Sequence, residues 1–220
     1  MYIHINRQTR VTFQELPMPI PPTISDLIQR FDNNRAAYQA ASYNEAQARQ
    51  EFINPLFEAL GWDVTNKQGR SEKYKEVIHE DTLRTRGGTK APDYAFRIGG
   101  QRVFFVEAKK PSVNVKADEH PAYQLRRYAW SAKLPLSILT DFEEFAVYDC
   151  RDRPVRSDNA ATARVMYFTY HDYPQRWDEI AGIFSPEAIY SGALDRYVDS
   201  TKAKRGTAEV DAAFLAEIEG

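Results

Sequence analysis

Apolar positions recur along the chain with two different periods, which together predict a mixed α/β protein. Helical spacing predicts five helices, at residues 24–39, 43–60, 119–133, 173–184 and 186–197. Short apolar runs bounded by turn residues predict a β-hairpin that reaches residue 107 and three further strands, at 136–140, 144–149 and 164–170. We therefore expect a central mixed β-sheet of about four to five strands, flanked by helices.

The helix predicted over 43–60 carries its own boundary signals. Ser42 and Glu45 have the spacing of a capping box, which predicts the start of the helix. Gly61 follows the apolar stripe and suits the C′ position at a helix end. Pro55 lies inside the pattern and predicts a kink, because proline removes one backbone hydrogen bond.

The hairpin carries the candidate chemistry. Asp93 follows Pro92 and lies fourteen residues before Glu107, which opens the triplet Glu-Ala-Lys. Two carboxylates on strands can hold a hard divalent cation through oxygen ligands. Lys109 lies two residues beyond Glu107, so strand alternation directs both side chains to one face. A metal beside a fixed cation suits attack on a phosphodiester, whereas the alternative is a surface hairpin with an exposed ion pair.

The proposed site requires Asp93 to lie opposite Glu107. A two-residue turn at Gly99-Gly100 would pair Asp93 with Val106 and turn Glu107 to the other face of the sheet. A three-residue loop over 99–101, or a bulge near Pro92, restores the required register. We predict one of these two irregularities.

Pro92-Asp93 together with Glu107-Ala108-Lys109 resembles the core of the PD-(D/E)xK nuclease superfamily. The resemblance implies a restriction-endonuclease-like core that binds Mg²⁺, for which Mn²⁺ can substitute. The implied metal ligands are the carboxylates of Asp93 and Glu107 and the carbonyl of Ala108. Lys109 would orient or activate the attacking water, or stabilise the charge of the phosphorane.

A second element follows on the predicted helix over 119–133. Gln124 and Tyr128 are four residues apart and share a helix face. They resemble the Gln-x-x-x-Tyr element of restriction motor subunits, which implies a role at the DNA backbone or in orienting the active site. Arg126 and Arg127 lie between them and are placed to reach phosphates. The alternative is an aromatic stripe of Tyr123, Tyr128 and Trp130 packed on the sheet.

Relatives in this superfamily often begin with a helix whose glutamate approaches the metal site. Glu45 resembles that residue, since it opens the helix predicted over 43–60. The capping box competes for the same side chain, and Glu51 is the alternative active-site acid.

The formal net charge of −2 hides a basic region over residues 84–133, which holds eleven basic and four acidic side chains. Such a surface suits a polyanion and predicts salt-dependent binding. The alternative is a solvated charged face. We expect double-stranded DNA to be contacted by Arg86, Lys90, Arg126, Arg127 and Tyr128.

Composition limits the class of protein and the cellular compartment that we expect. A chain of 220 residues that is 43% hydrophobic can bury one sizeable core. No apolar run is long enough to cross a bilayer, and no signal-peptide core is present at the start of the chain. The single cysteine, Cys150, excludes an intrachain disulfide and predicts a cytoplasmic setting.

We divide the chain into an N-terminal extension and helix (1–41), a nuclease domain (42–200) and a linker (201–220). The apolar spacing over 207–220 resembles the linker that leads to the methyltransferase in type IIG and single-polypeptide type I restriction-modification enzymes. No Asn-Pro-Pro-Tyr motif occurs here, so methyltransferase and specificity domains would lie outside this chain. Cleavage of both strands would then require a transient dimer on DNA. The alternatives are a repair or recombination nuclease and a non-catalytic DNA-binding module.

Overall fold

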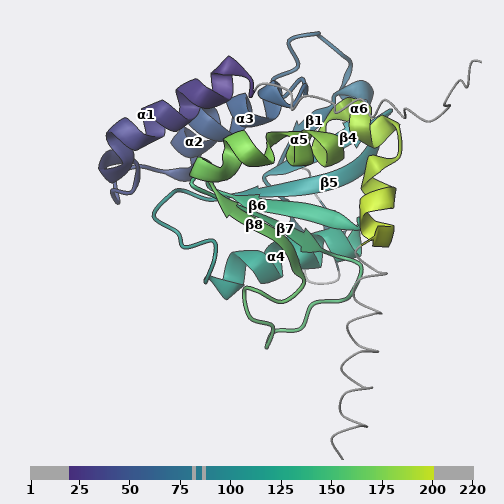
Figure 1. Ribbon diagram of the computed structural model, residues 1–220. Helices are drawn as coiled ribbons and strands as arrows, with labels where there is room; N and C mark the ends of the chain where they lie inside the picture. The colour runs from purple at the N-terminus through teal and green to yellow at the C-terminus, as the bar shows by residue number, and fades with distance from the viewer. Residues whose placement is uncertain (1–19, 81–82, 86–87, 201–220) are drawn as a thin grey trace, which may run out of the picture.

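A computed structural model describes residues 20–80, 83–85 and 88–200, with the side chains of 83–85 and 88–90 excluded. Its centre is a six-stranded mixed sheet, in the order β1-β4-β5-β6-β7-β8 (Figure 1). The strands are β1 (Val77–His79), β4 (Tyr94–Ile98), β5 (Gln101–Ala108), β6 (Leu136–Thr140), β7 (Glu144–Asp149) and β8 (Arg164–Thr169). A separate pair is formed by β2 (Leu83–Thr85) and β3 (Gly88–Lys90). The expected α/β fold is confirmed, and the strand beyond the expected four to five is β1, whose three residues are too short to give a period.

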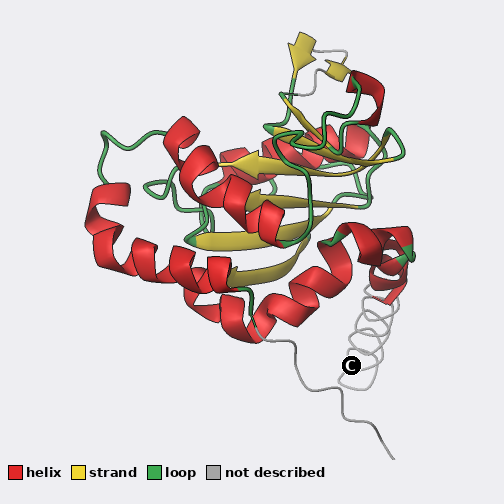
Figure 2. Cartoon of the chain, turned by 90° about the horizontal axis from the view of Figure 1, so that it is seen from above, coloured by secondary structure: helices red, strands yellow, loops and turns green. Residues whose placement is uncertain are grey.

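The two faces of the sheet are covered unequally. Among the described strands the only parallel pair is β5 with β6, and α4 (Glu119–Ser131) connects them and packs on one face over a smaller core. The other face carries the larger core, and four helices cover it (Figures 1 and 2). They are α1 (Pro22–Tyr38), α2 (Glu45–Ala48), α3 (Asn54–Ala59) and α5 (Tyr173–Phe184). The arrangement is restriction-endonuclease-like, and of the helices that the structure describes, α4 covers the side that bears the candidate site.

Helix α1 was expected in an N-terminal extension, but it packs in the same core as the sheet. Phe31 is fully buried, and its ring centroid lies 5.5 Å from that of Phe142 and 4.8 Å from that of Tyr170. Residues 1–19, the first part of the range predicted as extension and helix, and residues 201–220, the predicted linker, lie outside the described residues.

The segment predicted as one helix over 43–60 is divided into α2, a π-helical turn (Arg49–Ile53) and α3. Pro55 cannot donate a backbone hydrogen bond, and the wider turn before it accommodates that loss. The guanidinium of Arg30 instead donates to the carbonyl of Glu51, the acceptor that an α-helical residue at position 55 would use. Gly61 ends the helix at φ +101°, which confirms its expected role.

The helix start differs from the prediction. Asn44 is the N-cap, and its side chain accepts a hydrogen bond from the backbone N–H of Gln47, while the Gln47 side chain accepts one from the backbone N–H of Asn44. The capping box predicted for Ser42 and Glu45 is therefore wrong. Since Asn44 satisfies the helix terminus, the carboxylate of Glu45 is free to face the sheet.

The hairpin obtains its register in an unexpected way. Gly99 and Gly100 form a two-residue turn with φ values of +58° and +83°, so the predicted three-residue loop is wrong. The register shifts between Phe96 and Arg97, which leaves Val103 without an opposite residue. The bulge lies here and not near Pro92, yet it has the same consequence for the strands.

The prediction of one helix over 186–197 is also wrong. Helix α6 (Pro186–Tyr190) ends at a turn where Gly192 has φ +81°, and helical structure resumes over 193–200. Glycine tolerates this backbone conformation, and the chain changes direction there.

Candidate active site

Asp93, Glu107 and Lys109 meet at the adjoining ends of β4 and β5. Tyr94 pairs with Val106, so Asp93, one residue earlier, comes opposite Glu107. Strand alternation places both carboxylates on the same face as Phe105, which packs in the core beneath α4. The bulge at Val103 therefore brings together the two acids that the sequence motif predicts.

Asp93 is held through both carboxylate oxygens. Its Oδ2 accepts a hydrogen bond of 2.8 Å from the backbone N–H of Ala108, and its Oδ1 lies 3.2 Å from Nη1 of Arg49. Arg49 also lies 3.8 Å from the carboxylate of Glu80. One backbone donor and one guanidinium thus fix the orientation of Asp93.

Glu107 is buried and only partly satisfied. Its Oε1 accepts hydrogen bonds from Nζ of Lys109 at 2.9 Å and from Nε2 of Gln124 at 2.8 Å. Its Oε2 is buried and has no hydrogen-bond partner in the described part of the protein. Burial, reinforced by the charge of Asp93 and opposed by Lys109, raises the pKa of Glu107 to about 7.

Lys109 lies between the acids as a fixed cation. Its Nζ donates to Oε1 of Glu107, to the carbonyl of Ala108 at 2.8 Å and to Oε2 of Glu45 at 3.4 Å. Burial by itself acts to lower the pKa of Lys109, but Glu107 and the other nearby carboxylates outweigh it, and the pKa is raised. The side chain is therefore an ammonium in this arrangement.

Of the two candidate helix acids, the structure places Glu45 at this cluster through its contact with Lys109. The charge of Glu51 instead acts on Tyr43, whose pKa is raised chiefly by burial, and the Glu51 carbonyl accepts from Arg30 of α1. Glu51 is therefore directed to the helical side of the fold and not to the acids.

The donor set fits a hard divalent cation. Asp93, the carbonyl of Ala108 and the Glu107 oxygen that has no partner among the described residues would supply oxygen ligands, which Mg²⁺ prefers. Among the described residues, no group of three His, Cys, Asp or Glu side chains is arranged to hold a metal ion. A bound Mg²⁺ would accordingly use two carboxylates and one carbonyl and retain several water molecules.

Helix α4 directs Gln124 and Tyr128 toward the acids. Gln124 contacts Glu107 directly, and Tyr128 is buried with a raised pKa, caused first by burial and then by the charge of Glu107. The alternative of an aromatic stripe packed on the sheet applies to Tyr128 only, since Trp130 is 39% exposed and Tyr123 lines an open pocket.

The arginine and lysine residues expected to contact DNA lie in different environments. Arg126 is 3% exposed, and its Nη1 lies 2.8 Å from Oδ2 of Asp158, so its prediction as a phosphate contact is corrected to an internal ion pair. Helix periodicity explains this, because Arg126 shares a face with the buried Ala122 and Ala129. Arg127 is partly exposed beside the site. Arg86 and the side chain of Lys90 lie outside the described residues.

Arg49 is the residue at this site whose role the sequence did not indicate. It follows Glu45 by four residues, a spacing that shares a helix face, but its partner Asp93 lies 44 residues away in the sequence. The π-helical turn begins at Arg49. This backbone conformation, which orients the Arg49 side chain, was also not predicted.

The mixed sheet and its flanking helices define a restriction-endonuclease-like α/β domain. The family model described as MmeI, N-terminal domain, matches residues 25–203. RM.Eco57I of Escherichia coli, a type II restriction enzyme and methyltransferase, is 39% identical over 194 residues. The alignment covers 87% of this chain and 19% of that protein, so the chain spans about a fifth of its curated relative. No solved structure shows a significant match.

The chain belongs to the MmeI N-terminal domain family, which places it among the N-terminal domains of type IIG restriction-modification enzymes. None of the helices in the described ranges is both long and apolar enough to span a bilayer.

Proposed function

We propose that this domain is the Mg²⁺-dependent cleavage module of a restriction-modification enzyme and hydrolyses phosphodiester bonds of double-stranded DNA. The observation that carries the proposal is the convergence of Asp93, Glu107, the carbonyl of Ala108 and the ammonium of Lys109 at the ends of two adjacent strands. Neither a surface hairpin nor an exposed ion pair accounts for a glutamate that is 3% exposed and has one oxygen without a partner in the described part of the chain.

Asp93, Glu107 and the Ala108 carbonyl would hold the metal, for which Mn²⁺ can substitute. The ion would supply Lewis-acid stabilisation of the phosphate and a more acidic water. The ammonium of Lys109 would donate to a phosphate oxygen, or orient the attacking water, as negative charge grows on the phosphorane. Arg49 and Gln124 contact the acids and act as positioning residues.

Several properties of the enzyme as a whole follow from the same proposal. Membership of this family supports a role in restriction rather than in repair or recombination. The name of RM.Eco57I describes it as a restriction enzyme and methyltransferase. We propose that this chain likewise works with covalently linked methyltransferase and specificity domains, in the cytoplasm. With one site per chain, cleavage of both strands uses a transient dimer on DNA, and its rate should depend on protein concentration.

The test is conversion of supercoiled plasmid to nicked or linear DNA, in Mg²⁺ and in EDTA. We expect metal-dependent cleavage by the wild type, as this chain or within its longer polypeptide, and its loss in Asp93→Ala. Asp178→Ala is the matched control, because Asp178 is an exposed aspartate on α5. Equal activity of the wild type and Asp93→Ala, or cleavage that persists in EDTA, would overturn the proposal.

Metal binding has a second readout that does not need cleavage. Ca²⁺ or Mg²⁺ should raise the thermal midpoint of the wild type, because an ion that binds the native state stabilises it. The rise should be lost in Asp93→Asn and retained in Asp178→Asn.

A further inference from the structure

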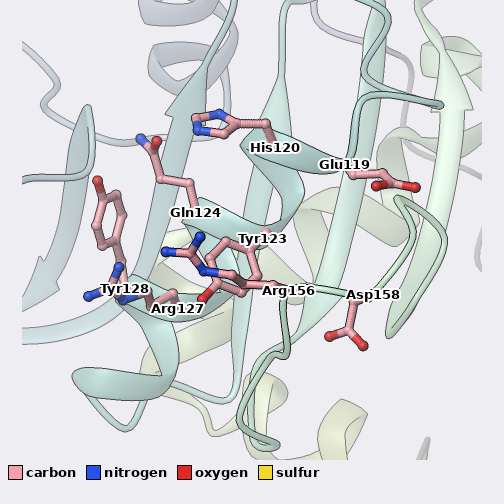
Figure 3. A pocket seen from close by; sticks show the side chains of 8 residues that line it. All are labelled: Glu119, His120, Tyr123, Gln124, Arg127, Tyr128, Arg156 and Asp158. Carbon is pink, nitrogen blue, oxygen red and sulfur yellow. The ribbon is translucent and has the colours of Figure 1, made fainter.

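A pocket of about 360 Å³ opens beside the active site, between α4 and the loop that connects β7 with β8. Figure 3 shows Tyr123, Gln124, Arg127 and Tyr128 reaching it from α4, and Arg156 and Asp158 from the loop. Its size is that of a small-molecule or single-nucleotide site. His120 and Glu119 stand at the start of α4 on the same pocket.

The pocket adjoins the candidate active site. Gln124 lines the pocket and donates to Oε1 of Glu107. Tyr128 also lines it, and the charge of Glu107 acts on its hydroxyl. A ligand in the pocket would therefore lie next to a phosphate bound at the acids.

The charge in the pocket favours an anion. The guanidinium groups of Arg127 and Arg156 form no hydrogen bond or ion pair with any residue that the structure describes, so both are available to a ligand. The carboxylate of Asp158 is already paired with the buried Arg126 and also accepts from the backbone N–H of Val155. These contacts fix the loop that carries Arg156. Of the two carboxylates that line the pocket, only Glu119 lacks a cation partner in the described ranges.

The remaining surface suits a base. Tyr123 lines the pocket and is partly exposed, so its ring is accessible for stacking, and its hydroxyl makes no hydrogen bond to a described residue. Aromatic rings bind bases of any sequence through their π faces, and arginine binds phosphate through paired N–H donors. An aromatic ring next to two free guanidinium groups therefore matches the two halves of a nucleotide.

We propose that this pocket holds one unpaired nucleotide of the cleaved strand, adjacent to the scissile phosphate. The proposal rests on the proposed function, because it assigns the nucleotide to the strand bound at the acids. The base stacks on Tyr123, and its phosphate lies on Arg127 and Arg156. A base inside a duplex cannot enter such a pocket, so this nucleotide leaves the stack when the domain engages its substrate. A free nucleotide has the same chemistry and is the competing source.

The test is binding of a short fluorescein-labelled single strand, followed by anisotropy in EDTA at several salt concentrations. Tyr123→Ala should weaken binding about tenfold, and Tyr123→Phe should retain it, because the phenyl ring still stacks. Arg156→Ala should weaken binding and lower the slope of log K against log salt by about 0.7. Arg153→Ala is the matched control, because Arg153 lies on the same loop but over the ring of Trp130.

Unchanged binding by Tyr123→Ala and Arg156→Ala would overturn the proposal. Displacement of the labelled strand by dTMP or AMP at lower concentration than by an unlabelled strand would overturn its assignment to DNA. Failure of the proposed function is separately visible. In that case neither the wild type nor any variant cleaves plasmid in Mg²⁺. Strand binding still depends on Tyr123 and Arg156, which supports the pocket as a DNA site.

Discussion

Gln124 donates from Nε2 to Oε1 of Glu107 at 2.8 Å, and this is the same oxygen that accepts from Lys109. The contact crosses from α4 to β5 and leaves the other oxygen of Glu107 without a partner among the described residues. The amide of Gln124 thus selects which carboxylate oxygen is available to a metal ion.

This relationship predicts a positioning role for Gln124. Gln124→Ala should lower cleavage at fixed Mg²⁺ by about tenfold to a hundredfold, because Glu107 loses a donor that orients it. Raising the Mg²⁺ concentration should restore part of the rate. Gln175→Ala on α5 provides a matched exposed control. A rate equal to that of the wild type at limiting Mg²⁺ would contradict the role.

Arg49 is expected to act on Asp93 in a similar way. Arg49→Ala should weaken Mg²⁺ binding by about tenfold, since of the described donors to Asp93 only the N–H of Ala108 would remain. Arg49→Lys keeps the charge but not the planar donor set, and should recover only part of the affinity. Calorimetric titration with Mg²⁺ measures the affinity of each variant. Affinity unchanged in Arg49→Ala would show that the ion pair does not position the acid.

Asp141 predicts a pH dependence of stability that is separate from the site. It is 1% exposed, its Oδ1 accepts from the N–H of Glu144, and its Oδ2 has no described partner. Burial, helped by the charges of Glu144 and Glu143, raises its pKa well above 3.8 in the folded protein. The folded state therefore binds more protons than the unfolded state, and the free energy of unfolding falls as the pH rises above about 4.

Asp141→Asn keeps the accepting oxygen and removes the charge, so its free energy of unfolding should fall less steeply with pH. Urea unfolding of both proteins at pH 5 and at about pH 8 measures the difference. Glu107 has a raised pKa in both proteins, so its contribution cancels in the comparison. Parallel pH profiles for the two proteins would contradict the burial argument.

The regular elements of the fold could be predicted because their apolar periods are strong. Strands β6 and β7 and helix α5 have the predicted bounds, since in each the apolar pattern is closed by turn or proline signals. The bulge at Val103 could not be placed, because every residue of the run over 103–106 is apolar and none is marked as the extra one. An irregularity was predicted only because the proposed site requires Asp93 to lie opposite Glu107.

The site was predictable only where its chemistry lies within one motif. Glu107 and Lys109 are two residues apart, so strand alternation indicated their common face, whereas Gln124 was placed near the active site by its resemblance to the Gln-x-x-x-Tyr element. Arg49 and Arg156 reach the site or its pocket from segments whose positions depend on tertiary packing. The prediction that Arg126 contacts DNA was wrong although the sequence could have excluded it. The apolar positions around Arg126 place it on the buried stripe of α4.

The most direct test of the central claim compares two adjacent lysines. The ammonium of Lys109 contacts Glu107, the Ala108 carbonyl and Glu45, whereas the side chain of Lys110 makes no hydrogen bond or ion pair with a described residue. Plasmid cleavage in Mg²⁺ should fall at least about a hundredfold in Lys109→Ala, because a fixed cation at the phosphorane is lost, and should change little in Lys110→Ala. Equal rates for the two variants would contradict the assignment of this cluster as a nuclease active site.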